Sequence, residues 1–390
     1  MIDSSLMNRQ ELEHKFEEIY GKKAEHLFFA PGRVNLIGEH TDYNGGLVFP
    51  CALSFGTYLL IAKREDAQNH FHSINMDFSA LVDLTIFEKK TNEWIQYPLG
   101  VMKDFADRGF DVWGYDLLYY GDIPNGAGLS SSASIEVVTA FMLNDLTQAG
   151  LSNIELVKIS QKAENQYVGV NCGIMDQFAV GMGKKNHAIA LNCSSLNYEY
   201  VPLAMNGFKL VIANTNKKRG LADSKYNERR TECEEAVANL SKVYPISTLC
   251  ELNEEKFEQY CSYISNPIVR RRAKHAISEN QRVIKAIQAL KNNDLPTFGQ
   301  LMNASHQSLK EDYEVTGIEL DTLAEESQKL DGVLGSRMTG AGFGGCTVTL
   351  IAEDQIENYI HTISHIYQAK VNLEVTFYIA EIGEGVRKLY

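Results

Sequence analysis

Gly126-Ala-Gly-Leu-Ser-Ser-Ser-Ala-Ser134 is a run of glycines and serines that joins a predicted strand to a predicted helix. Residues 115–120 predict the strand, and the residues from Asp122 to Gly126 are typical of a loop. From Ile135 to Leu146, apolar residues recur at helical spacing. A helix N-terminus presents unpaired N–H groups and the positive end of the helix dipole. The stretch therefore predicts an anion-binding loop, with a small-residue helix start chosen for packing as the alternative.

The charges around this loop limit how an anion could be bound there. No Lys or Arg occurs between Arg108 and Lys158. Backbone N–H groups and serine hydroxyls must therefore hold the anion, with or without a metal ion. The pattern Gly-x-x-x-x-Gly-Lys-Ser/Thr occurs nowhere in the chain, which excludes the P-loop as the kind of site.

Length and composition narrow the class of protein. A chain of 390 residues with 44% hydrophobic residues suggests two globular domains, and a change to helix-rich sequence near residue 205 divides them into 1–205 and 206–390. The net charge of −13 argues against broad binding to nucleic acid or to an anionic membrane. There is no signal-peptide pattern and no apolar run of the ~18 residues that a membrane span needs. Seven scattered cysteines without zinc spacing indicate a reducing, cytoplasmic environment.

A second glycine-rich loop, residues 31–46, carries an unusual density of charge. It holds Arg33, Glu39, His40 and Asp42 beside an apolar Val-x-Leu-Ile at positions 34–37. Our hypothesis is that Glu39 and Asp42 accept hydrogen bonds from a polyol while Arg33 neutralises developing charge. The alternative is a salt-bridged turn.

Two carboxylates further along the chain are candidates for chemistry. Ser152 caps a predicted helix that runs to about residue 168 and carries Glu164. Asp176 follows the glycine-bracketed turn 169–173 and is either a helix N-cap or a functional carboxylate. A third glycine loop, 338–346, lies between two predicted strands, which excludes a dinucleotide-binding fingerprint because no helix follows it.

The three loops together resemble the motifs of one family. Gly32-Arg-Val-Asn-Leu-Ile-Gly-Glu-His-Thr-Asp-Tyr43 resembles the galactokinase signature. The stretches 126–134 and 339–346 resemble the second and third motifs of the GHMP kinases, and all three occur in the family's order. The resemblance implies a two-domain α+β fold. In it, a ribosomal-S5-like N-terminal domain packs against a ferredoxin-like C-terminal domain, with the active site between them.

The resemblance also implies an activity and its residues. The activity is transfer of the ATP γ-phosphoryl group to the anomeric hydroxyl of α-D-galactose, with ATP and D-galactose as partners and Mg²⁺ as cofactor. The pair at the reacting hydroxyl is Arg33 and Asp176, and the metal positions are Ser132 and Glu164. The implied sugar contacts are Glu39, His40, Thr41, Asp42, Gly173 and Tyr226. The implied phosphate loop is Gly126, Ala127, Gly128, Leu129, Ser130, Ser131 and Ser132.

Other readings of the same motifs stay open. One is a related sugar-1-kinase that acts on N-acetylgalactosamine or L-arabinose. Another is a non-catalytic regulator that responds to galactose and ATP, although the complete serine run and Asp176 favour an enzyme. A nucleic-acid-binding protein of S5-like fold fits poorly with the net charge of −13. The sequence is compatible with a monomer and does not indicate a regulator of the activity.

Overall fold

A computed structural model describes residues 7–83, 94–123, 128–217 and 222–390 of the chain. The N-terminal half is built around a mixed six-stranded sheet. The strand order is β13-β1-β3-β6-β4-β5, with β4 and β6 parallel and the other pairs antiparallel. The strands are β1 (His26–Asn35), β3 (Pro50–Lys63), β4 (Gln68–Ser73), β5 (Phe78–Asp83), β6 (Tyr115–Gly121) and β13 (Arg387–Lys388). A smaller sheet joins β2 (Leu47–Val48), β7 (His187–Asn192) and β8 (Tyr198–Pro202).

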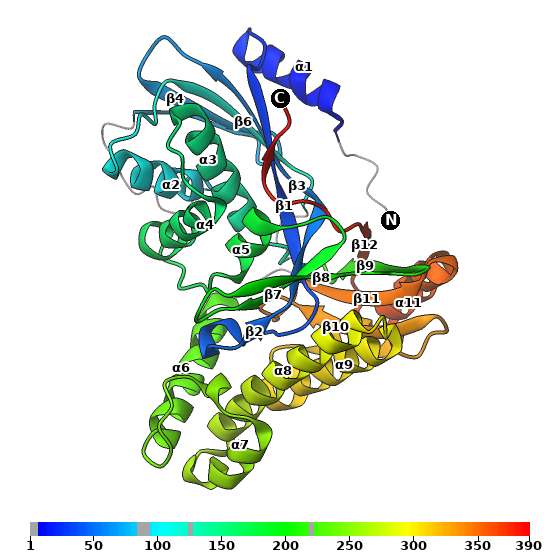
Figure 1. Cartoon of the computed structure of the whole chain (residues 1–390). Coiled ribbons are helices and arrows are strands. Elements are labelled where there is room, and N and C mark those ends of the chain that lie inside the picture. The colour runs from blue at the N-terminus through cyan, green and yellow to red at the C-terminus, as the bar shows by residue number, and fades with distance from the viewer. Residues whose placement is uncertain (1–6, 84–93, 124–127, 218–221) are drawn as a thin grey trace.

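Side chains along β1 alternate between the two faces of the large sheet, and apolar side chains on both faces explain why helices cover both. Phe28 and Ala30 point into one core cluster, whereas Leu27 points into another that contains Leu12 and Phe16. Figure 1 shows the helices α2–α5 gathered on the first face and α1 on the other. These helices are α1 (Arg9–Tyr20), α2 (Gln96–Asp107), α3 (Ser131–Thr147), α4 (Asn153–Lys162) and α5 (Met175–Met182).

The C-terminal half contains a four-stranded antiparallel sheet in the order β10-β11-β9-β12. Its strands are β9 (Phe208–Asn214), β10 (Val333–Thr339), β11 (Cys346–Ala352) and β12 (Thr376–Ala380). Helices lie between β9 and β10, and α11 lies between β11 and β12, so the order along the chain is βαββαβ, which is the ferredoxin-like arrangement. The helices are α6 (Ala222–Leu240), α7 (Glu254–Tyr260), α8 (Pro267–Lys291), α9 (Leu295–Ser308), α10 (Ile318–Ser327) and α11 (Ile356–Val371).

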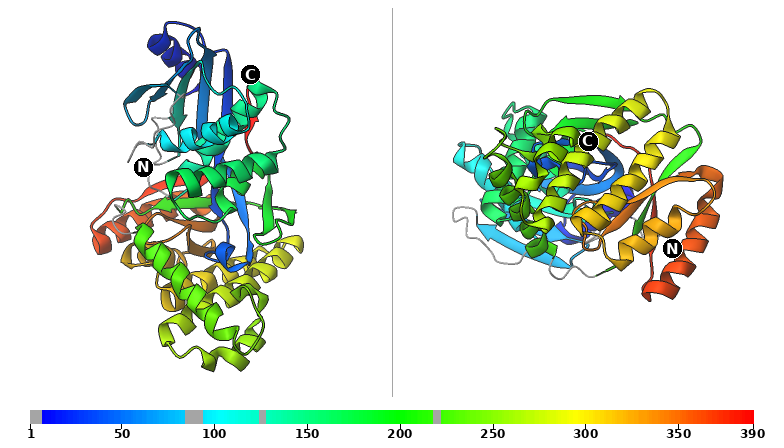
Figure 2. Two further views of the ribbon diagram at one scale, coloured as in Figure 1. Left: turned by 90° about the vertical axis from the view of Figure 1, so that its left-hand side faces the viewer. Right: turned by 90° about the horizontal axis from the view of Figure 1, so that it is seen from below.

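The two halves share a hydrophobic cluster, and the last strand of the chain belongs to the sheet of the first half. One hydrophobic cluster joins Val34 and Phe49 of the first half to Ile212, Val283 and Val348 of the second. The last strand, β13, returns to pair with β1, and both views in Figure 2 place the C-terminus against the N-terminal sheet. The boundary proposed at residue 205 lies just before β9; the shared hydrophobic cluster spans it, and each half also has buried clusters of its own.

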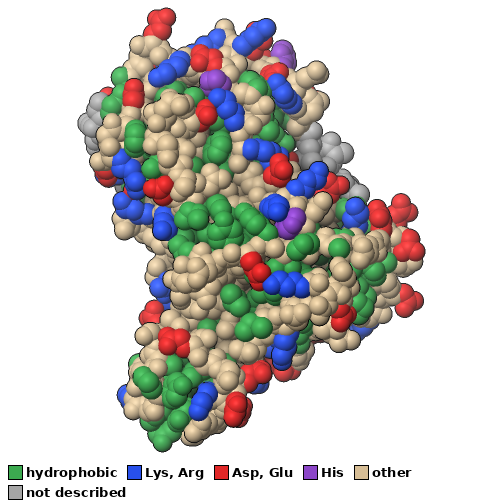
Figure 3. Space-filling view, viewed as in Figure 1, with side chains coloured by type: hydrophobic (Ala, Val, Ile, Leu, Met, Phe, Trp, Pro, Cys, Tyr) green, Lys and Arg blue, Asp and Glu red, His purple; other side chains and the backbone are tan. Residues whose placement is uncertain are grey.

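Acidic and basic side chains are interspersed over the face shown in Figure 3. Within the described ranges, no helix combines the length and the apolar character that crossing a bilayer demands.

Candidate active site

Most of the side chains singled out in the sequence line one cleft between the two halves. The cleft has a volume of about 290 Å³. It is lined by Arg33, Glu39, His40, Asp42, Tyr97, Ser132, Glu164, Val170, Cys172, Gly173, Met175, Asp176, Tyr226, Gly340 and Ala341. All three glycine-rich loops therefore contribute to the same cleft.

Arg33 and Asp176 form a paired charge at one wall of the cleft. Arg33 lies on β1 and is buried; its Nε and Nη2 donate to the two Asp176 oxygens at 2.8 and 2.9 Å. Ser130 Oγ donates to the same carboxylate at 2.6 Å, and Arg33 Nη1 donates to Gly128 O at 2.6 Å. The N-cap of α5 is Ile174, which makes no side-chain cap, so Asp176 is not an N-cap. Its carboxylate instead joins β1 to the serine loop.

The serine loop turns into α3 through an unusual backbone conformation. Gly128 has a φ of 75° and Ser130, the N-cap of α3, has a φ of 64°, both in the left-handed region. Ser130 makes no side-chain cap, because its hydroxyl is bonded to Asp176. The N–H groups of the first turn of α3 thus have no side-chain partner at the cap. Gly126 and Ala127, two of the implied phosphate-loop residues, lie outside the described residues.

Glu39 is buried between the two halves and held by the third loop. Its Oε1 accepts from Gly340 N at 2.8 Å, and from Arg337 Nη1 and Thr339 Oγ1 at 3.3 Å each. Burial raises the pKa of the Glu39 carboxyl, and the charges of Arg337 and Arg33 oppose that rise. The third loop therefore stabilises and orients the first.

His40 is neutral and has a defined tautomer. Burial lowers the pKa of its imidazole to about 3. Its Nε2 lies 3.1 Å from Ala341 O, a carbonyl that can only accept, so Nε2 carries the proton. Nδ1 then accepts from Tyr43 Oη at 2.8 Å, and Tyr43 Oη in turn lies 2.6 Å from Tyr313 Oη. Both ring nitrogens are thus engaged by protein groups.

Asp42 faces the cleft beside Gly173 and Tyr226. A Cβ at Gly173 would lie 1.9 Å from Asp42 Oδ2, so any larger residue there would displace the Asp42 carboxylate. Burial, with a further contribution from the charge of Asp176, raises the pKa of Asp42 to about 6. Thr41, the neighbouring implied sugar contact, is fully buried, and its Oγ1 lies 2.9 Å from Gly38 O and 2.7 Å from Leu47 O. Its hydroxyl therefore stabilises the turn.

Glu164 and Ser132 both line the cleft. Glu164 lies in a π-helical turn (Ala163–Val168) and accepts from Gln177 Nε2 at 2.6 Å. Burial and the charge of Asp176 raise the pKa of Glu164 to about 7, and a hydrogen bond with the Ser132 hydroxyl opposes this. A buried carboxylate beside a hydroxyl, with no cation paired to it within the described ranges, is a donor set that fits Mg²⁺.

A second cavity, of about 370 Å³, adjoins the serine loop and was not foreseen from the sequence. It shares Ser132 with the first cleft and includes Trp94 and Tyr97. Its full lining is Thr57, Ser73, Asn75, Met76, Trp94, Tyr97, Tyr119, Gly121, Ile123, Ser131, Ser132 and Ile135. The Trp94 Nε1–H is buried and makes no hydrogen bond to any described residue. The exposed lining is mainly apolar, which suits a flat organic ring.

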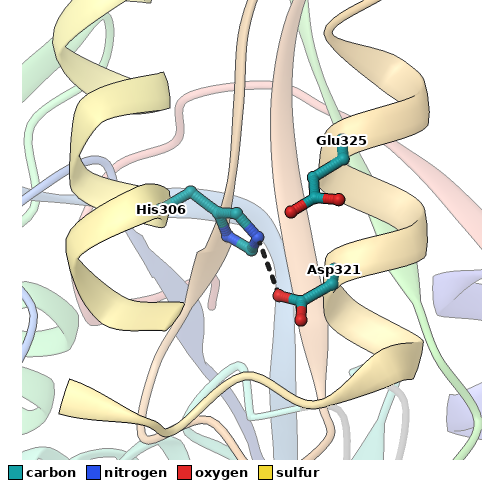
Figure 4. Close-up of side chains that lie close together, drawn as sticks. All are labelled: His306, Asp321 and Glu325. Atoms are coloured by element: carbon teal, nitrogen blue, oxygen red, sulfur yellow. Dashed lines mark ion pairs between the residues drawn. The ribbon is translucent and has the colours of Figure 1, made fainter. Parts of the chain in front are cut away.

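A histidine and two carboxylates outside these cavities, drawn in Figure 4, do not fit a metal centre. His306 Nδ1 accepts from Met338 N at 3.2 Å, so the proton of the neutral ring lies on Nε2. Nε2 therefore carries the ring proton and does not coordinate a metal; it lies 3.2 Å from Asp321 Oδ1 without hydrogen-bond geometry. Lys310 Nζ already contacts Glu325. Lys310, which follows α9, thus pairs with the two carboxylates on α10, Asp321 and Glu325.

Comparison with known proteins gives a consistent family. Residues 14–63 match the galactokinase galactose-binding signature, and residues 96–184 and 286–365 match the N- and C-terminal GHMP kinase domains. The chain is 54% identical over 383 residues to the galactokinase of Clostridium beijerinckii, covering 97% of this chain and 98% of that one. It is 50% identical to the galactokinase of Bacillus subtilis, covering 98% and 99%.

Solved structures agree with these matches. Lactococcus lactis galactokinase complexed with galactose superimposes with a TM-score of 0.94 at 45% identity, covering 97% of this chain and 99% of that one. Methanococcus jannaschii mevalonate kinase shares the fold, with a TM-score of 0.67 at 18% identity, covering 92% and 99%. The two-domain α+β fold expected from the motifs is confirmed.

Proposed function

We propose that this chain, which belongs to the galactokinase family of the GHMP kinases, transfers the γ-phosphoryl group of ATP to the anomeric hydroxyl of α-D-galactose. The products are α-D-galactose 1-phosphate and ADP. The observation that carries the proposal is the cleft in which the Arg33–Asp176 pair faces the buried carboxylates of the galactose-binding signature. The relatives at 50–54% identity bear the name galactokinase.

Galactose occupies the part of the cleft that Glu39, Asp42 and Tyr226 line. Carboxylates accept hydrogen bonds from sugar hydroxyls, and a buried acceptor left unpaired by the wrong epimer is costly. His40 contributes shape and packing more than hydrogen bonds, because both of its ring nitrogens have protein partners. We therefore expect a strong preference for D-galactose over D-glucose.

The anomeric hydroxyl lies against Asp176 during the reaction. In a loose phosphoryl-transfer transition state the attacking hydroxyl loses its proton late. Asp176 orients the hydroxyl and accepts its proton as the new O–P bond forms, while the bond from the γ-phosphorus to ADP breaks. Arg33 balances the charge on Asp176 and keeps both carboxylate oxygens in place.

ATP binds across the serine loop with its phosphates at the N-terminus of α3. The first-turn N–H groups and the hydroxyls of Ser131 and Ser132 provide the anion site without a lysine. The adenine ring enters the adjoining cavity beside Trp94 and Tyr97. Ser132 and Glu164 would hold Mg²⁺, which supplies charge neutralisation for the phosphates. All seven cysteines are free thiols, which supports our placing the reaction in the cytoplasm.

A panel of sugars tests this function. Purified protein is incubated with ATP, Mg²⁺ and one sugar at a time, and ADP release is measured. We expect turnover with D-galactose and little with D-glucose, L-arabinose or N-acetylgalactosamine, and a phosphorus NMR spectrum that identifies galactose 1-phosphate. Galactose binding without ADP release would instead establish a regulator, and faster turnover of another sugar would reassign the substrate.

A further inference from the structure

We infer that Glu279, together with His275 on the same face of α8, is a positioning residue that sets the affinity for galactose by clamping the backbone of Glu39. The inference rests on the proposed function, because it concerns the sugar site of that reaction. Glu279 and His275 are not among the residues that line the cleft, and neither belongs to the three glycine-rich loops.

The contacts of Glu279 reach the first loop from the other half of the molecule. Its Oε1 accepts from Gly38 N at 2.9 Å and from Glu39 N at 3.3 Å. The carboxylate is fully buried, and its Oε2 accepts from Arg282 Nε at 2.7 Å. Burial alone would raise the pKa of Glu279, but the charges of Arg282 and Arg337 hold it well below its ordinary value, so the clamp is ionised. Charged acceptors make the stronger hydrogen bonds.

His275 completes the clamp one helical turn earlier. Residues four apart lie on the same helix face, so His275 and Glu279 meet the loop side by side. His275 Nε2 lies 3.1 Å from Glu39 O, which can only accept, so the ring donates to it. Burial lowers the pKa of His275 to about 4, and the ring remains neutral at physiological pH. Both the N–H and the C=O of Glu39 are therefore bonded to α8.

The clamp matters because the side chain of Glu39 is held separately. Arg337, Thr339 and Gly340 hold its carboxylate from β10 and the third loop. With backbone and side chain both anchored, the loop has one position in which Glu39 lines the cleft. Gly38 has a φ of 98°, and glycine can adopt many other backbone conformations. The hydrogen bonds from Glu279 and His275 therefore keep the loop in the one that lets Glu39 line the cleft.

The test compares Glu279→Gln with a matched variant, Asp116→Asn. Asp116 is also a buried carboxylate held by two cations, with Arg64 at 2.6 Å and Lys22 at 2.8 Å, but it lies on β6 outside the lining of both cavities. The measurements are the galactose Kd, the KM for ATP, kcat at saturating galactose, and the thermal midpoint. Each variant is the full chain with a single substitution.

We expect both variants to lower the thermal midpoint and only Glu279→Gln to weaken galactose. The substitution replaces the charged acceptor of two backbone N–H groups with a neutral amide oxygen, which should raise the galactose Kd about tenfold or more. The KM for ATP and the saturated kcat should stay within about twofold, because the serine loop is untouched. An unchanged galactose Kd in a destabilised Glu279→Gln would overturn the inference and leave Glu279 with a structural role alone.

A second substitution keeps the inference testable if Glu279→Gln does not fold. His275→Phe removes the donor to Glu39 O but keeps a ring packed against that of Tyr313, whose centroid lies 4.6 Å from that of His275. We expect a severalfold rise in the galactose Kd, and an unchanged Kd would count against the clamp. Failure of the parent chain to bind galactose would instead reject the proposed function.

Discussion

Asp176 is the residue whose environment best separates a chemical from a structural role. It lies in the first turn of α5, yet its two oxygens are bonded to Arg33 and Ser130, on β1 and at the start of α3. None of these bonds satisfies an N–H group of α5 itself. The carboxylate therefore serves the cleft, where about a third of its side-chain surface is exposed (31%).

Asp176→Asn should separate turnover from stability. An amide is nearly isosteric, but it cannot take a proton and it turns an N–H toward Arg33. We expect kcat to fall by ~10²–10⁴ while the Kd for galactose and for ATP changes much less. The thermal midpoint should move by no more than a few degrees, because the ion pair is partly exposed. A variant with parental kcat would remove Asp176 from the mechanism.

The raised pKa of Asp42 predicts that galactose binding depends on pH. Its pKa is raised to about 6, so lowering the pH from 7 to 5 protonates it in the free protein and removes its charge as an acceptor. We expect the galactose Kd to rise about tenfold between pH 7 and pH 5. Because the folded state binds the proton on Asp42 more tightly than the unfolded chain does, Asp42 contributes more to stability over the same interval. The buried, neutral His40 and His275 contribute less there, because their pKa values are lowered, so the thermal midpoint is measured at each pH.

The Asp42 prediction is measured by galactose titration without nucleotide or divalent metal. Asp42→Asn should bind weakly at every pH and flatten the profile. Asp122→Asn serves as the control, because Asp122 also has a pKa raised to about 6 but accepts from Gly56 N outside the sugar cleft. A profile that is flat in the parent, or that disappears in the Asp122 variant, would contradict the assignment.

At the scale of elements, the start of α3 combines strain with function. Ser130 has a left-handed φ of 64°, which costs a non-glycine residue about 1–2 kcal/mol. The hydrogen bond from the Ser130 hydroxyl to Asp176, at 2.6 Å, offsets part of this free-energy cost. The turn thus aims the first-turn N–H groups of α3 and steadies Asp176 at once.

Two substitutions of Ser130 separate the strain from the hydrogen bond. Ser130→Ala keeps the strain and loses the bond, whereas Ser130→Gly loses both. We expect the glycine variant to be about 1 kcal/mol more stable than the alanine variant, measured by denaturant unfolding. Both should have a similarly reduced kcat. Equal stabilities would mean that the left-handed conformation is not strained in the protein.

The sequence predicted the elements whose signals are local. The serine loop, the helix after it and the Ser152 capping box of α4 follow from composition and spacing over a few residues. The Trp94 cavity was missed because β4, β6, α2 and α3 build it from segments far apart in the chain. The orientation of Thr41 was equally hidden, because its neighbours in the motif face the cleft while its own hydroxyl points to Gly38 O and Leu47 O. Neither fact leaves a trace in local periodicity.

At the scale of the molecule, the cleft exists only because the halves are packed together. Glu39 comes from the first half, while Arg337, Glu279 and His275, which hold it, come from the second. Arg337 is fully buried and also donates to Asn35 O and Leu36 O. Removing one partner of such a buried charge leaves the other uncompensated, at a cost of about 3–5 kcal/mol.

Residues 1–205 produced alone test whether the division at 205 separates folding units. The fragment lacks β13, which pairs with β1, and it exposes Val34, Phe49 and their neighbours, which pack against Ile212, Val283 and Val348 in the whole chain. It also lacks Arg337, the cation that pairs with Glu39 in the whole chain. We therefore expect no cooperative thermal transition and poor dispersion in the amide NMR spectrum, whereas the whole chain gives both. A sharp transition in the fragment would show that the N-terminal sheet folds by itself even without β13. The hydrophobic cluster shared by the two halves would then serve to assemble the cleft rather than to fold either half.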